Sequence, residues 1–94
     1  MQLGIVVGQV VSTVKCAGLG RDSLLLVEFV DAQGNSMGPP QVAADGIGAG
    51  NGEWVLLVGG SSARKVSGGE LPVDLCVIGI VDQVVRDNRV TYRK

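Results

Sequence analysis

The sequence predicts an all-β protein, organised as a small closed or nearly closed antiparallel barrel of five or six short strands. Short apolar runs rich in Val, Ile and Leu alternate with breaks rich in turn-forming residues, and 15 of the 94 residues are glycine. No segment long enough for an α-helix shows a clean helical period. This spacing favours a barrel over a sheet of alternating strands and helices. One or two short helical turns and a C-terminal strand complete the expected fold.

The first half of the chain predicts three strands. Residues Leu3–Val14 are rich in Val and Ile, and Gly4 and Gly8 predict a bend there, because glycine inside a strand marks a bend or a close backbone approach. Residues Ser23–Asp31 carry apolar side chains on both faces. We therefore expect the barrel core to cover one face and a neighbouring molecule to cover the other. After a segment dense in turn formers, a third strand is expected near Gln41–Ala44.

The second half of the chain predicts two or three further strands. Trp54–Val58 is a short, fully apolar strand. Within Gly59–Lys65 a helical turn is expected, with Ser61 or Ser62 as its cap. The remaining expected elements are a second helical turn from Pro72 through Cys76, a strand at Val77–Val85, a turn at Asp87–Asn88 and a last strand at Arg89–Arg93.

The composition points to a single domain, residues 1–94, that assembles with other subunits. Apolar residues make up 46% of the chain and charged residues only 18%. A chain of this length has a small core, so it cannot hide all of this apolar surface by itself. A subunit interface is the usual place for such a surplus.

The composition also argues against several function classes. The chain has no His, a net charge of −1 and 3% aromatic residues, which disfavour general-base catalysis, metal binding and nucleic-acid binding. Cys16 and Cys76 form no CxxC pair and are expected to be buried thiols in a reducing cytosol. No apolar run approaches 18 residues, so neither a signal peptide nor a membrane span is expected. The cations at the C-terminal end fit a solvated strand end better than a binding patch; they are Arg86, Arg89, Arg93 and Lys94.

The segment Gly46–Glu53, here called the glycine loop, is the first candidate site. Its four glycines alternate strictly, at positions 46, 48, 50 and 52. Glycine-rich loops can cradle phosphate with backbone N–H groups, and a small-molecule or phosphate-binding module is the alternative function. The loop lacks the Gly-Lys-Ser/Thr ending of a P-loop and the long helix of a dinucleotide fold. A tight structural loop, or one packed against a symmetry partner, is the favoured interpretation.

Two further groups of polar residues fit structural roles better than catalytic ones. A serine nucleophile at Ser61 or Ser62 would need an adjacent base, and only Lys65 could serve. The carboxylates Asp45 and Glu53 flank the glycine loop, but Asp45 fits a turn residue. Asp74 and Asp82 flank an apolar run, and Asp74 fits a helix cap after Pro72. We therefore expect no enzymatic activity and no cofactor or metal.

Three stretches together resemble the small shell-vertex family of bacterial microcompartments, which includes ethanolamine-utilisation and carboxysome vertex proteins. They are Asp45–Val58, containing IGAGNGEWVLL; Gly60–Arg64, GSSAR; and Pro72–Asp82, PVDLCVIGIVD. Further matches at Gly8–Lys15 and Leu24–Glu28 extend the resemblance over the whole chain. It is closest to the ethanolamine-type branch.

The resemblance implies a five-stranded barrel of the oligonucleotide/oligosaccharide-binding type, used without that ligand. It implies a homopentamer that meets hexameric shell proteins at a vertex of the shell, in the cytoplasm. A small change in interface angle would give a hexamer instead. The implied subunit-interface or ring-centre residues are Gly48, Ala49, Gly50, Asn51, Gly52, Glu53, Ser61, Ser62 and Arg64.

Overall fold

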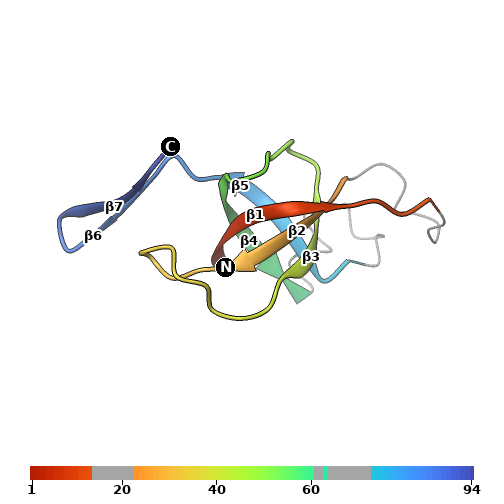
Figure 1. Cartoon of the computed structure of the whole chain (residues 1–94), viewed down its shortest axis with the longest axis horizontal. Helices are drawn as coiled ribbons and strands as arrows, with labels where there is room; N and C mark the ends of the chain where they lie inside the picture. Colours follow the sequence, from red (N-terminus) through yellow and green to blue (C-terminus); the bar gives the residue numbers. More distant parts are fainter. Residues whose placement is uncertain (14–22, 61–62, 64–72) are drawn as a thin grey trace.

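The computed structural model describes residues 1–13, 23–60, 63 and 73–94, and its described part is a closed five-stranded barrel with a two-stranded hairpin at one end (Figure 1). The barrel order is β1-β2-β3-β5-β4, with β4 pairing back to β1. The strands are β1 (Gln2–Val10), β2 (Ser23–Phe29), β3 (Gln41–Asp45), β4 (Trp54–Gly59), β5 (Leu75–Ile80), β6 (Gln83–Arg86) and β7 (Arg89–Arg93).

Strand pairing confirms the barrel and corrects its expected direction at one place. β1 lies between β2 and β4, and both of these pairs are antiparallel. β3 and β5 instead run parallel, with Ala44 opposite Cys76 and Asp45 opposite Val77. The local sequence pattern specifies which residues are buried, but it does not specify the direction of a partner that lies 30 residues away. The prediction of an antiparallel barrel is therefore wrong for this one pair.

The glycines of β1 permit the bend that the sequence predicts. A Cβ atom on Gly4 would lie 2.6 Å from Leu57 Cδ1 and 3.1 Å from the Glu28 carbonyl oxygen. Gly4 therefore lets β1 approach its neighbours more closely than any other residue would allow. The pairing of β1 with β2 shifts register between Val6 and Gly8, which is a β-bulge in the middle of the strand.

The barrel interior is filled by alternating aliphatic side chains. On β2, Leu25 and Val27 point inward and are buried, while Leu24 and Leu26 lie on the outer side and are half-buried. This is the two-faced pattern that the sequence predicts. The core cluster consists of Val6, Leu25, Val27, Ala43, Val55, Leu57, Leu75 and Val77.

Two expected boundaries are wrong. β1 ends at Val10 instead of Val14, and the described residues that follow, 11–13, are not in a strand. The helical turn from Pro72 through Cys76 is replaced at its end by strand, since Leu75 and Cys76 pair with Gly59 and Val58. Barrel closure decides this segment, because those pairs satisfy backbone groups that a single helical turn would leave open. In the other predicted helical turn, Gly60 and Ala63 are helical, and residues 61–62 and 64–65 lie outside the described residues.

The segment Val77–Val85, predicted as one strand, does not form one strand, because the chain leaves the barrel at Val81. The Val81 N–H donates to the Trp54 carbonyl oxygen at 2.8 Å, and the side chain of Val81 is buried. After Asp82 the chain enters β6, turns at Asp87 and Asn88 and returns as β7, so the expected C-terminal strand is one arm of a hairpin. Both turn residues have positive φ (52° and 63°), as a two-residue hairpin turn requires, which confirms the predicted turn.

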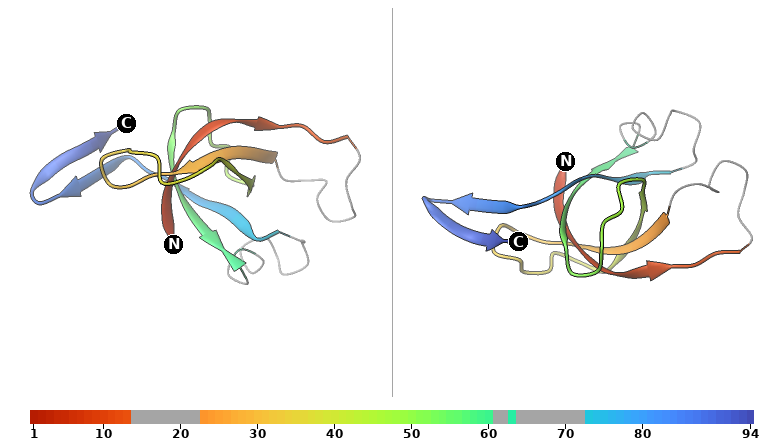
Figure 2. Two further views of the ribbon diagram at one scale, coloured as in Figure 1. Left: turned by 60° about the horizontal axis from the view of Figure 1, so that its bottom comes forward. Right: turned by 90° about the horizontal axis from the view of Figure 1, so that it is seen from above.

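The β6–β7 hairpin extends away from the barrel. Figure 2 shows it projecting at the same end as the 31–40 segment, and it accounts for the elongated dimensions of 45 × 23 × 22 Å. β6 and β7 pair with each other and with no barrel strand.

Candidate subunit-interface site

The glycine loop is organised from inside by the carboxylate of Asp45. Asp45 is the last residue of β3, and its side chain is only 3% exposed. Its carboxylate accepts hydrogen bonds from three backbone N–H groups, those of Ile47 (2.9 Å), Gly48 (3.1 Å) and Ala49 (2.8 Å). The turn role predicted for Asp45 is confirmed. Because these amides already donate to an internal carboxylate, they are not free to bind phosphate.

The second half of the loop is tied to β1. The Gly52 N–H donates to the Val6 carbonyl oxygen at 2.8 Å, and the Val6 N–H donates to the Glu53 carbonyl oxygen at 3.0 Å. The Gly50 N–H donates to Glu53 Oε1. Gly48 and Gly52 have φ of +99° and +86°, in the left-handed region that favours glycine. The loop is therefore a fixed structural feature of the barrel surface.

The outer side of the loop offers an open, partly apolar surface. An open groove of about 390 Å³ runs between the loop and β1; Val7, Gly8, Ala49 and Gly50 are among its lining residues. Val7 is 40% exposed and Ile47, beside the groove on the loop, is 50% exposed. Exposed glycines and short side chains permit another chain to approach the backbone closely.

Glu53 connects the glycine loop to the C-terminal end of the chain. Its Oε2 atom lies 2.7 Å from Lys94 Nζ. The hydrogen bond with Lys94, followed by that from the Gly50 amide, lowers the pKa of Glu53 from its ordinary value, and the pKa of Lys94 is raised in return. Next to this ion pair, the ring of Trp54 stacks on that of Tyr92, with centroids 4.3 Å apart and an interplanar angle of 19°. The base of the hairpin is thus fastened beside the loop.

Comparison with known proteins identifies the family. The family model described as ethanolamine utilisation protein EutN/carboxysome matches residues 1–82. The chain belongs to this EutN/CcmL family. The matched residues end where β6 begins, so they correspond to the barrel and exclude the hairpin.

Curated members of the EutN/CcmL family align along the whole chain. The bacterial microcompartment shell vertex protein EutN of Salmonella typhimurium is 60% identical over 95 residues, covering 100% of this chain and 96% of that protein. The carboxysome shell vertex protein CcmL of Gloeobacter violaceus is 48% identical, with coverage of 100% and 95%. The resemblance predicted from the sequence is confirmed, including the closer match to the ethanolamine branch.

Solved structures of the EutN/CcmL family match the fold. An ethanolamine utilisation protein EutN superposes with a TM-score of 0.94 at 57% identity and covers 100% of this chain and 99% of its own. The GrpN pentameric microcompartment shell protein from Rhodospirillum rubrum gives a TM-score of 0.84 at 43% identity, with coverage of 92% and 99%. The predicted barrel fold is thereby confirmed.

The predicted site residues divide into two groups. The structure places Gly48 to Glu53 together in the glycine loop, whereas Ser61, Ser62 and Arg64 lie outside the described residues. The sequence analysis assigned no role to Tyr92 and interpreted Lys94 as part of a solvated strand end, whereas both residues fasten the hairpin beside this loop. The run of C-terminal cations was the only available signal for that contact.

The described residues contain neither a cluster of metal-ligating side chains nor a helix that could span a membrane. No group of three or more His, Cys, Asp or Glu side chains within residues 1–13, 23–60, 63 and 73–94 could hold a metal ion. Over the same ranges, no helix has the length and apolar character to span a membrane.

Proposed function

We propose that this chain is a non-catalytic structural subunit that closes into a pentamer and caps the vertices of a bacterial microcompartment shell in the cytoplasm. The observation that carries the proposal is the 60% identity over the full chain with a protein named as a shell vertex protein, together with a TM-score of 0.94 to a EutN structure. All of residues 1–94 act as one pentamer-forming unit. The compartment is of the ethanolamine-utilisation type.

The physical mechanism is geometric. A cyclic ring needs a heterologous interface, in which one face of a subunit docks on a different face of the next. A five-fold ring placed among hexameric shell proteins introduces curvature and closes the polyhedron. The hexameric shell proteins are therefore the partners that this role requires. No cofactor or metal takes part.

The glycine loop is the proposed contact near the ring centre, and the Gly60–Arg64 stretch is proposed to lie at a neighbouring contact. The fixed backbone of the glycine loop, held by Asp45, and its exposed glycines support close packing between subunits. The internal use of its amides speaks against the phosphate-binding alternative. Addition of phosphate esters should accordingly leave the melting temperature unchanged.

Native mass spectrometry at micromolar subunit concentration tests the assembly. The expected result is a dominant pentamer. A soluble monomer alone, or a hexamer alone, would contradict the proposal.

Gly50→Arg tests the position of the glycine loop. The long side chain should prevent ring closure and leave a folded monomer. Gly50→Ala is the matched control, since its Cβ would meet only the end of the Glu53 side chain, 3.2 Å from Oε1, which a shift of a few tenths of an ångström relieves, and it should keep the ring. A native pentamer from Gly50→Arg would show that the loop is not part of the subunit contact.

Arg64→Ala tests the neighbouring contact and should weaken the ring. Unchanged ring stability would show that Arg64 is not part of the subunit contact.

A further inference from the structure

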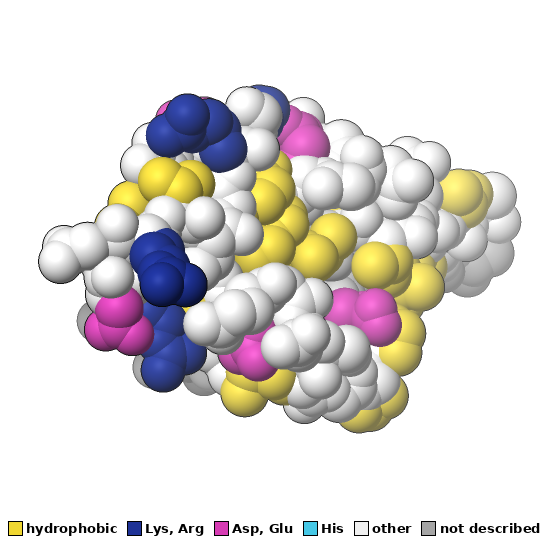
Figure 3. All heavy atoms as spheres, turned by 60° about the vertical axis from the view of Figure 1, so that its left-hand side comes forward, with side chains coloured by type: hydrophobic (Ala, Val, Ile, Leu, Met, Phe, Trp, Pro, Cys, Tyr) yellow, Lys and Arg dark blue, Asp and Glu magenta, His cyan; other side chains and the backbone are white. Residues whose placement is uncertain are grey.

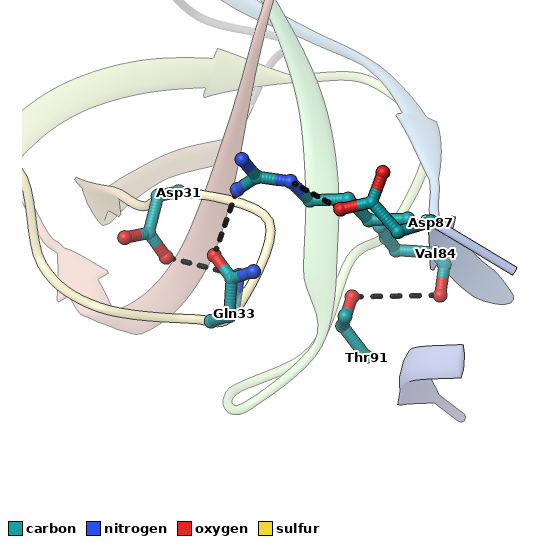
Figure 4. Close-up of polar contacts among 6 residues, drawn as sticks. Asp31, Gln33, Val84, Asp87 and Thr91 are labelled. Carbon is teal, nitrogen blue, oxygen red and sulfur yellow. Dashed lines mark hydrogen bonds and ion pairs between the residues drawn. The ribbon is translucent and has the colours of Figure 1, made fainter. Parts of the chain in front are cut away.

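The β6–β7 hairpin is supported by its own chain on one side only. None of its residues is buried, and a hairpin of two strands is only marginally stable in water when nothing packs on it. One side of the hairpin does face the rest of the chain. On that side Val84 and Tyr92 pack near Trp54, and Arg86 Nη1 donates to Gln33 Oε1 at 3.3 Å (Figure 4).

The opposite side of the hairpin, here called its outer face, is uncovered. Val85 and Val90 lie directly opposite each other across the strands and are 56% and 46% exposed. Successive residues of a strand point to opposite sides, so Gln83, two residues before Val85, lies on this same face, and so does its partner Arg93. Arg93 forms no ion pair with any residue that the structure describes. The outer face therefore carries an apolar pair, Val85 and Val90, and a cation, Arg93, whose partner Gln83 lies two residues from Val85 along β6.

Charge distribution sets the hairpin apart from the barrel. The described Lys and Arg side chains all belong to the hairpin and the residue that follows it, and Figure 3 shows them gathered at that end beside apolar side chains. The described part of the barrel carries carboxylates without cations. The cations of the hairpin and the carboxylates on the described part of the barrel are complementary between copies.

The outer side of β2 and β3 carries the matching pattern. Leu26 and Val42 lie directly opposite each other on this side, and Val42 is 46% exposed. Glu28 follows Leu26 two residues later on the same side and is half-buried. Within the described chain its carboxylate forms no ion pair and accepts no hydrogen bond. Gly8, opposite Leu26, adds no side chain that would cover the pair. Leu26, Val42 and Glu28 are here called the outer wall.

We propose that the hairpin is a docking arm whose outer face packs on the outer wall of a neighbouring copy of this chain. Val85 and Val90 cover Leu26 and Val42, and Arg93 pairs with Glu28. On the hairpin and on the wall alike, the charged residue lies about 7 Å from the apolar pair, which is two residues along a strand. A single alignment of the two surfaces can therefore form the apolar contact and the ion pair together. The arm and the wall are different surfaces, so the contact is heterologous and propagates around a ring. The inference rests on the proposed ring and names its interface.

A charge-swap cycle tests the arm. Arg93→Glu and Glu28→Arg should each raise the subunit concentration at which half of the rings dissociate by about tenfold or more. The double variant should return to within about threefold of the unchanged protein, because the pair is restored with its polarity reversed. Native mass spectrometry over a dilution series gives the concentrations, and the fluorescence of Trp54 checks that each variant is folded.

Two matched variants control for changes in charge that do not involve the proposed Arg93–Glu28 pair. Arg89→Glu makes the same charge change on the inner face of the hairpin and should leave the ring within about threefold of unchanged. Combining Arg93→Glu with Asp87→Arg restores net charge at the exposed turn of the hairpin, outside the proposed Arg93–Glu28 contact, and should not restore the ring. If Arg93→Glu leaves the ring intact, or the swap does not recover it, the docking arm is wrong and the pentamer stands. If the unchanged protein forms no ring, the proposed function fails first.

Discussion

The inward-facing valine residues of the barrel are buried, whereas no valine of the hairpin is. In the barrel, Val27 and Val55 are fully buried, whereas in the hairpin Val85 and Val90 are about half exposed. Both regions are β-sheet and both are rich in β-branched side chains. The difference lies in closure: the barrel folds its sheet back on itself and supplies its own second layer, whereas a two-stranded ribbon has none. The barrel is thus stabilised within the chain, and the hairpin depends on what packs against it.

The largest expected difference between the two regions is the loss of unfolding free energy when an apolar side chain is shortened to alanine. Leu57→Ala should lower the free energy of unfolding by about 2–5 kcal/mol, because Leu57 is 1% exposed at the centre of the barrel. Val85→Ala should change it by less than about 0.5 kcal/mol in the dissociated subunit. Urea unfolding at one low subunit concentration measures both. Equal losses would show that the hairpin is as well supported as the barrel.

The next effect concerns the turn under Trp54, where barrel and hairpin meet. Gly34 has a φ of +90°, and a Cβ there would lie 2.8 Å from Trp54 Cζ2. Gly34→Ala should cost about 2–4 kcal/mol, from backbone strain and displacement of a rigid ring. Gly38→Ala is the control, because its φ is +145° and a Cβ there meets nothing within 4 Å. It should cost only the backbone strain, so equal losses in urea unfolding would count against the clash with Trp54.

A smaller effect is expected from loosening the hairpin alone. Tyr92→Ala removes the stacked ring and should cost roughly 1 kcal/mol beyond the lost buried area. Trp54 is the only tryptophan of the chain, so its emission should shift towards that of a water-exposed indole. Hydrogen exchange should quicken in β6 and β7 while the amides of β1 to β5 keep their protection. Faster exchange throughout the barrel would instead show that the two regions unfold together.

The smallest effect is the pH dependence of the Glu53–Lys94 pair. The pKa of Glu53 is lowered in the folded chain, so its contribution is present above the ordinary value of 4.5 and is lost as pH falls through the folded value. Glu53→Gln should remove this part of the acid sensitivity. Other carboxylates such as Asp31, whose pKa is also lowered, titrate in both proteins and cancel in the comparison. Urea midpoints at neutral pH and below 4.5 measure the difference, and parallel curves for the two proteins would contradict it.

The sequence predicted the barrel well because its core uses short-range signals. Alternation places Leu25 and Val27 inside, and glycines mark the bend of β1. The break at Val81 was not predicted, because Asp82 and Gln83 are only two polar residues between apolar ones, and a strand with one solvent-facing side also accepts polar residues. The structure locates the break: the Val81 N–H donates to the Trp54 carbonyl oxygen, and the next strand, β6, pairs only with β7. The parallel pairing of β3 and β5 likewise depends on tertiary closure.

The glycine loop was predictable as a structural loop, and Asp45 as its turn residue. The contacts to Tyr92 and Lys94 were not, because they join residues about 40 positions apart in the chain. The uncovered side of β2 was predicted from its two apolar faces. The complementary face of the hairpin needed the cross-strand register, in particular the bulge between Val84 and Val85, before Arg93 could be placed beside the valine pair.

The position of β1 between β2 and β4 has a consequence for the newborn chain. The second edge of β1 cannot pair until β4 has been synthesised, because Gln2 pairs with Leu57. The barrel can close only after β5 has left the ribosome as well. Until then β1 and β2 form an open ribbon with unpaired edges, which can join other chains. The strands of the hairpin follow β5 in the chain, so a subunit gains its docking arm only once its barrel has the residues needed to close. Order of synthesis thereby separates folding from assembly.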